Sequence, residues 1–175
     1  IARYVAARDR LISADLLYRC GCTRGDISEA LKHKPVPHGP DGPHYPGTCR
    51  EQPFAGDGPY SWRLNTQKAA DLAGPLMWTD LAAGQQYADP MAFGDVVLWR
   101  KDAPASYHLA VTIDDAAQGV TLAALVGIDG RVDADIAQLH APALIMFVHQ
   151  IGQDDDIGNL GNLVDRCHRA VNRLL

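Results

Sequence analysis

Hydrophobic residues recur at three- and four-residue spacing in several segments of the N-terminal half, as they do along amphipathic helices. The polar residues between them are mainly arginines and aspartates in the first segment. The predicted helices span residues 1–18, residues 27–33 with Asp26 as N-cap, and residues 65–73 with Asn65 or Thr66 as N-cap. The N-terminal half is therefore predicted to be mainly helical.

The pattern changes after Tyr87, where short runs of β-branched, leucine-rich or aromatic residues are bounded by turn residues. Runs of this kind are typical of β-strands. The four predicted strands span residues 95–100, 107–113, 120–126 and 143–150. The polar segment 114–119 predicts a hairpin between the second and third strands. Apolar spacing over residues 157–175 predicts a closing amphipathic helix.

Proline and glycine interrupt both periodicities over residues 34–60, which predicts a long irregular loop. Such loops in compact domains are usually functional or held in place by other groups. Helices first, an antiparallel sheet second and one terminal helix together indicate an α+β fold. A chain of 175 residues that is 47% hydrophobic can bury a core of its own, so we expect one domain over residues 1–175.

The charge and the apolar content of the chain limit the kinds of partner that we expect it to bind. The formal net charge is −5, and a protein that neutralises phosphates needs a basic surface, so we expect no nucleic acid partner. The longest apolar run, residues 141–148, is too short to cross a bilayer, so no membrane span is expected. A signal sequence has a charged region, then an apolar region, then a cleavage site of small residues, and the first residues of this sequence do not show that pattern. This observation does not decide whether the protein is secreted.

A polar turn at Gly94-Asp95 precedes the apolar run that ends at Trp99, and the next predicted strand begins with Tyr107-His108. An imidazole at the entrance of a buried strand has a rigid element behind it and one ring edge free. A general base needs that placement. His108 is therefore a candidate base, and a surface histidine without a role is the alternative.

This pair of segments resembles the second half of NlpC-type cell-wall peptidases and the related CHAP amidases. The resemblance implies a papain-like fold, with N-terminal helices packed on a central antiparallel sheet and a C-terminal helix. It implies a cysteine hydrolase that cleaves amide or peptide bonds in bacterial peptidoglycan, with His108 as the base. The implied partners are peptidoglycan or peptide substrate and an inhibitory or immunity protein, the implied location is the bacterial envelope or outside the cell, and no cofactor is required.

The nucleophile in this interpretation is a cysteine at a helix N-terminus. Cys22 is the first choice because helix amides and a nearby imidazolium both favour a thiolate. Cys20 and Cys49 are alternatives. In another register Ile27 occupies the nucleophile position, and the chain would then be an inactive NlpC-like module that only binds.

A papain-like site also needs a third polar group that holds the imidazole tautomer. Asp129 is the candidate, because a hairpin around residues 116–119 would place the carboxylate of Asp129 near His108. A simple turn aspartate is an equally good interpretation of Asp129. His140 is a second candidate.

A third hypothesis comes from thiols and imidazoles in and before the loop. They are Cys20, Cys22, His33, His38, His44 and Cys49. Zinc takes four such ligands, so the loop would serve a zinc-stabilised interaction domain. The spacing matches no standard zinc finger. A disulfide from Cys49 to Cys20 or Cys22 would hold the same loop equally well.

Overall fold

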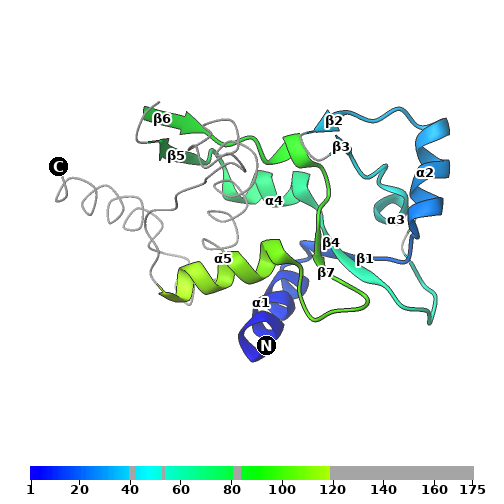
Figure 1. The fold of residues 1–175 in the computed structure, drawn as a ribbon, viewed down its shortest axis with the longest axis horizontal. Coiled ribbons are helices and arrows are strands. Elements are labelled where there is room, and N and C mark those ends of the chain that lie inside the picture. The colour runs from blue at the N-terminus through cyan, green and yellow to red at the C-terminus, as the bar shows by residue number, and fades with distance from the viewer. Residues whose placement is uncertain (40–41, 53, 81–83, 119–175) are drawn as a thin grey trace, which may run out of the picture.

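The computed structural model describes residues 1–39, 42–52, 54–80 and 84–118. These residues form a mixed helical and sheet architecture around a three-stranded antiparallel sheet (Figure 1). The strand order is β1 (Leu17–Cys20), β4 (Ser61–Leu64) and β7 (Val97–Trp99), so β4 is central and β1 lies at an edge. The strands come from distant parts of the sequence, which means that the sheet joins the N-terminal residues to those near 100.

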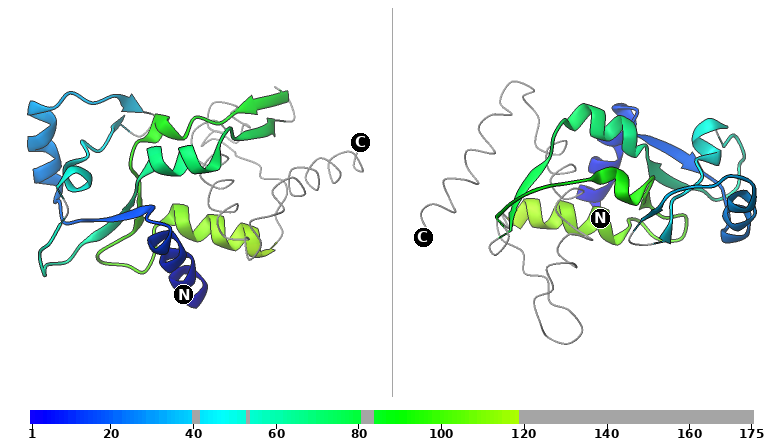
Figure 2. Two further views of the ribbon diagram at one scale, coloured as in Figure 1. Left: turned by 180° about the vertical axis from the view of Figure 1, so that it is seen from behind. Right: turned by 90° about the horizontal axis from the view of Figure 1, so that it is seen from above.

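Two helices cover the sheet. α1 (Ala2–Ser13) and α5 (Tyr107–Gln118) lie next to each other, and both contact strands of the sheet (Figures 1 and 2). Leu17 and Leu64 are paired across β1 and β4, and their side chains enter the same core as the apolar stripes of the two helices. The core consists of Leu11, Leu16, Leu17, Leu64, Ala69, Leu76, Leu98, Leu109 and Ile113. Burial of this apolar surface is the main source of stability of the described part.

The elements that follow β1 are grouped beyond its C-terminal end, on the right of Figure 1. They are α2 (Arg24–His33), the strand pair β2 (His38–Gly39) and β3 (Gly42–Pro43), and the short α3 (Thr48–Glu51). The predicted irregular loop 34–60 therefore contains local structure. The predicted N-cap of α2 was wrong: Thr23 is the N-cap, and Asp26 completes a capping box with it.

The remaining elements connect β4 to β7. They are α4 (Thr66–Ala73), the hairpin of β5 (Met77–Asp80) and β6 (Gly84–Tyr87), and a 3-10 turn, η1 (Pro90–Phe93). Asn65 caps α4 through its side chain, as predicted, by accepting a hydrogen bond from the Lys68 N–H. The Asn65 cap starts α4 directly where β4 ends.

Two element predictions were wrong. The predicted helix over residues 1–18 ends at Ser13, because Asp15 has a left-handed φ of 55° that no helix continues through. Residues 107–113 form a helix and not a strand. Ser106 accepts a hydrogen bond from the Leu109 N–H at the start of α5, and the buried positions 109, 112 and 113 follow helical spacing.

The first predicted strand, 95–100, is confirmed in shortened form as β7. The segment 114–118 continues α5, so the predicted hairpin does not start there. The predicted strands 120–126 and 143–150, the closing helix and residues Asp129 and His140 lie outside the described residues. Among the helices of the described part, none has the length and apolar character that crossing a bilayer demands.

Candidate metal centre

Three cysteines from two segments meet beyond the end of β1. Cys20 ends β1, Cys22 follows two residues later, and Cys49 lies on α3. Their sulfur atoms are all within 4.8 Å of one another, and those of Cys22 and Cys49 are 3.4 Å apart. All three are free, so the predicted disulfide is not present. Sulfur atoms at these distances are close enough to share one cation.

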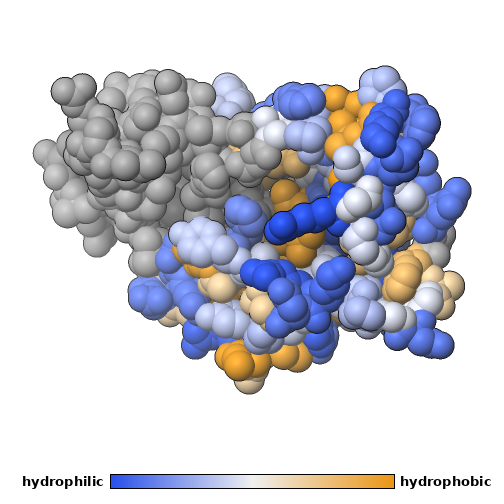
Figure 3. Space-filling view, turned by 45° about the vertical axis from the view of Figure 1, so that its right-hand side comes forward, coloured by the Kyte–Doolittle hydropathy of each residue, from blue (hydrophilic) through white to orange (hydrophobic). Residues whose placement is uncertain are grey.

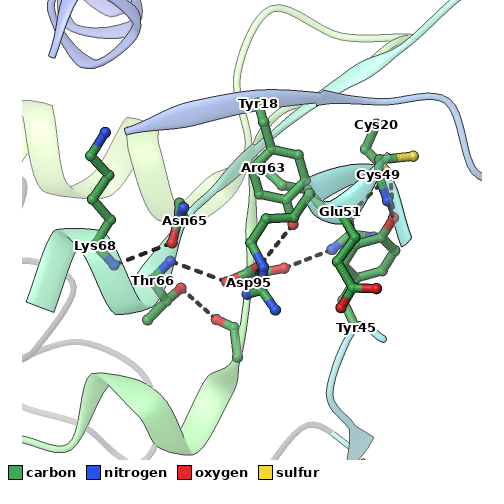
Figure 4. Close-up of polar contacts among 12 residues, drawn as sticks. Tyr18, Cys20, Tyr45, Cys49, Glu51, Arg63, Asn65, Thr66, Lys68 and Asp95 are labelled. Atoms are coloured by element: carbon green, nitrogen blue, oxygen red, sulfur yellow. Dashed lines mark hydrogen bonds and ion pairs between the residues drawn. The ribbon is translucent and has the colours of Figure 1, made fainter. Parts of the chain in front are cut away.

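Tyr45 brings a fourth polar group to the same point. Its hydroxyl oxygen is 3.5 Å from the sulfur of Cys20 and 3.3 Å from that of Cys22. It also accepts a hydrogen bond of 2.9 Å from the Cys49 N–H, which fixes its position over α3 (Figure 4). Three sulfurs and one oxygen are therefore arranged around one small volume, and four is the number of donors that a tetrahedral zinc site uses.

The surroundings act differently on the three thiols. Burial works to raise the pKa of Cys20, but hydrogen bonds with Tyr45 and Arg63 outweigh it, and the pKa falls below its ordinary value. Burial, together with the neighbouring Cys49 and Cys20, raises the pKa of Cys22 to about 11. Cys22 is therefore protonated at neutral pH without a cation, and a bound cation would remove its proton.

A buried carboxylate connects this cluster to the sheet. The Asp95 side chain, only 2% exposed, accepts hydrogen bonds from Tyr18 Oη at 2.7 Å, Arg50 Nη1 at 2.8 Å and the Thr66 N–H at 3.1 Å (Figure 4). Arg50 follows Cys49 on α3, so its ion pair with Asp95 holds this helix against the sheet.

Arg63 makes a second connection from β4. Its guanidinium lies 4.0 Å from the centre of the Tyr45 ring, donates to the Cys20 sulfur at 3.4 Å and donates to the Asp95 carbonyl oxygen at 2.8 Å. One side chain thus contacts two of the four donor groups of the cluster. The positions of the cluster's donors therefore depend on the sheet and not on the loop alone.

The structure separates the residues of the predicted catalytic site. Cys22 lies in the thiol cluster, whereas His108 lies in the first turn of α5, with its ring 6.1 Å from that of Tyr107. In Figures 1 and 2, α5 lies away from α3. The third predicted member, Asp129, lies outside the described residues.

The structure brings together only some of the six residues that were predicted as zinc ligands. The three thiols come together, whereas two of the three imidazoles have other partners. His44 Nε2 is 2.8 Å from the Ala92 carbonyl oxygen, and His33 Nε2 is 3.3 Å from Glu29 Oε1. Sequence reasoning missed Tyr45, whose only signal is its position four residues before Cys49.

Comparison with known proteins matches the chain to no family profile. Relatives named glutamyl-Q tRNA(Asp) synthetase are similar to it. The one from Geobacter sulfurreducens is 42% identical over 120 residues, 67% of this chain and 36% of the relative. Those from Leptothrix cholodnii and Rhodobacter capsulatus are each 40% identical, over 124 and 128 residues, which are 69% and 67% of this chain and 41% and 46% of the relatives.

These similarities overturn the resemblance to NlpC and CHAP proteins. The relatives are synthetases, so the predicted cysteine peptidase or amidase activity on peptidoglycan is wrong, and so are the predicted wall-peptide partner and the exclusion of nucleic acid. The resemblance depended on a short motif whose second half is helical. The papain-like arrangement, the single domain over 1–175 and the envelope location stay untested predictions.

The chain spans less than half the length of the curated relatives that it matches. Eight of these relatives, from 37% to 42% identical to the chain, carry the same name. The described elements and the thiol cluster thus belong to a chain that resembles a part of these synthetases.

Proposed function

We propose that this chain is part of a synthetase that forms glutamyl-Q tRNA(Asp), and that its thiol cluster is a structural zinc centre of that enzyme. The observation that carries the first statement is the identity of 42% over 120 residues with the Geobacter sulfurreducens synthetase. A match over 67% of the chain does not depend on one short motif.

The donor set supports the second statement. Zinc in structural sites is held by four protein ligands and keeps no open position, and thiolates are its preferred donors. Cys20, Cys22 and Cys49 supply three thiolates, and the oxygen of Tyr45 is placed to be the fourth ligand. With all four positions taken by the protein, the metal has no site for substrate, so its role is to hold α3 and the loop before it against β1.

The test of the first statement is a transfer assay with the whole protein that carries this chain. Labelled glutamate and ATP are supplied with tRNA(Asp) that contains Q, and acid-precipitable label is counted. Label is expected on this tRNA and not on tRNA(Asp) without Q, which is the matched control. Equal labelling of both RNAs, or of neither, would show that the proposed reaction is wrong.

The test of the zinc centre is elemental analysis of protein purified without chelator. About one zinc per chain is expected, and Cys49→Ser should lose it, because Cys49 supplies the only thiolate from α3. Cys167 is outside the described residues and outside the proposed ligand set, so Cys167→Ser is the matched control and should keep the metal. Retention of full zinc by Cys49→Ser would refute this ligand set.

A further inference from the structure

A cavity of about 360 Å³ lies beside the edge strand β1. Aromatic side chains that line it are Tyr18, Phe54 and Trp62, and the cations that line it are Arg19 and Arg50. Its volume is within the range of sites that hold small organic groups. Cys49 and Arg50 connect the wall of this cavity to the thiol cluster.

The ring of Tyr60 neighbours two of the aromatic rings of the cavity wall, Phe54 and Trp62. The ring centres of Phe54 and Tyr60 are 6.2 Å apart, and those of Tyr60 and Trp62 are 5.6 Å apart in an edge-on arrangement. The guanidinium of Arg19 lies 4.6 Å from the centre of the Tyr60 ring and 5.5 Å from that of Trp62. A planar cation from the edge strand β1 and planar rings from the segment around β4 are thus gathered beside the cavity.

The charge around the cavity favours an anion. Asp15 is the carboxylate in the lining, and it is paired with Lys68. Arg50 is paired with Asp95 but stays 39% exposed. Among the described residues no carboxylate forms an ion pair with Arg19, which is exposed. The charge of Arg19 is therefore available to a phosphate.

We propose that this cavity binds one unpaired nucleotide of RNA, with the base against Phe54 and Trp62 and a phosphate at Arg19. Proteins recognise unpaired RNA bases by stacking them on aromatic rings or guanidinium planes, while arginines hold the backbone. Bases within a double helix are stacked on one another and do not reach such a cavity. The naming of RNA as the ligand rests on the proposed function, because the relatives are named for a tRNA product.

A protein partner is the less favoured occupant. The face in Figure 3 is mostly hydrophilic, and its hydrophobic side chains gather in small separate patches. Stable protein interfaces cover a broad area, and the described residues visible on this face show no single broad hydrophobic patch. The net charge of −5 does not oppose the proposal, since a phosphate responds mainly to charges within a Debye length of about 10 Å.

The experiment measures binding of tRNA(Asp) and of a short single-stranded RNA by fluorescence anisotropy, with Arg19→Gln and Phe54→Leu in the whole protein. Loss of a stacked base should weaken binding by roughly 5- to 150-fold in Phe54→Leu. Loss of one phosphate contact should lower the salt dependence by about 0.7 in log–log slope in Arg19→Gln. Arg24→Gln removes an exposed charge on α2 and is the matched control, expected to bind like the unaltered protein.

Zinc content and the circular dichroism spectrum show whether each variant is folded. Phe54 packs on Gly21, which lies between Cys20 and Cys22, so Phe54→Leu can disturb the thiol cluster. The side chain of Arg19 is exposed, so Arg19→Gln keeps the test independent of folding. Ultraviolet crosslinking should join the RNA to the peptide around residues 54–62. Unchanged affinity and salt slope in folded Arg19→Gln, or a short peptide competing with RNA for the cavity, would overturn the proposal.

The transfer assay separates this proposal from the proposed function. If glutamate transfer occurs and Arg19→Gln leaves the KM for tRNA unchanged, the cavity proposal fails and the proposed function stands. If transfer never occurs and RNA binding still depends on Arg19 and Phe54, the proposed function fails and the cavity proposal stands.

Discussion

The buried carboxylate of Asp95 allows a quantitative test of how the thiol cluster is attached to the sheet. Asp95→Asn keeps the size of the side chain and one oxygen, which can still accept from the Thr66 N–H at the Oδ1 position. The other oxygen, which accepts from Tyr18 and from Arg50, becomes an NH2 group that donates. Two charge-assisted hydrogen bonds are therefore lost, and donors face donors in their place.

Each hydrogen bond to a charged group contributes about 1.5–3 kcal/mol. Arg50 is 39% exposed and water can replace part of its bond, so the lower value applies to it, and the same value is taken as the minimum for the Tyr18 bond. The free energy of unfolding should fall by about 3 kcal/mol, which lies at the lower end for a broken buried ion pair. With a urea dependence of about 1–3 kcal/mol per molar, the midpoint should move down by about 1–3 M.

The assay is urea unfolding followed by circular dichroism at a fixed concentration of zinc. Asp102→Asn is the matched control, because Asp102 also pairs with an arginine, Arg100, but its side chain is 63% exposed. Exposed pairs of this kind contribute little to stability, because water screens them. A loss below about 1 kcal/mol in Asp95→Asn, or equal losses in both variants, would refute the idea that burial makes this carboxylate important.

Other predictions concern the cluster itself. Tyr45→Phe keeps the ring under Arg63 but removes the oxygen, which is the proposed fourth ligand. Loss of a group that only supports a ligand weakens metal binding by at least about ten-fold, so competition with a chelator should show zinc binding weakened by at least this factor. In metal-free protein, NMR of 13Cβ-labelled cysteine should show Cys20 ionising below its ordinary pKa and Cys22 at about 11; the reverse order would contradict the hydrogen-bond assignment. Because the pKa of Cys22 is raised in the folded state, its contribution to stability is complete below the ordinary pKa of 9.0 and is lost as the pH rises to about 11. Denaturation measured at a series of pH values should therefore show the free energy of unfolding declining over this range, and a Cys22→Ser variant should lack this part of the decline. Gly21→Ala would place a Cβ 2.3 Å from the Phe54 ring, so zinc content should fall; the matched variant Gly25→Ala, where the nearest atom is 3.6 Å away, should keep it.

Local patterns predicted the elements whose start is encoded by neighbouring residues. Asn65 begins α4 as expected, because its side chain bonds the N–H of Lys68 three residues later. The run Tyr107–Ile113 was misassigned because β-branched and aromatic residues are common in strands. The structure decides otherwise through Ser106 at the helix start and through burial of one helical face against β7. The latter information is tertiary and is not present in the segment.

The cluster could be predicted only in part for the same reason. Three cysteines within thirty residues suggested a metal or a bridge, but the choice between thiols and imidazoles depends on which side chains β1 and α3 bring together. Asp95 looked like a turn residue before a strand, and only the folded chain shows it to be buried among Tyr18, Arg50 and Thr66. Total charge misled for a related reason, since it says nothing of where a single arginine such as Arg19 lies.

The electrostatics of the cluster also count against Cys22 as a thiol nucleophile. A cysteine nucleophile needs a low pKa, which an imidazolium or a helix N-terminus provides. Cys22 instead has two other thiols within 4.8 Å, and ionisation of any of them opposes ionisation of Cys22. Three thiols at such distances become stable anions together only when a cation lies between them. The proximity that makes Cys22 a poor nucleophile is therefore the property that suits the cluster to the proposed zinc.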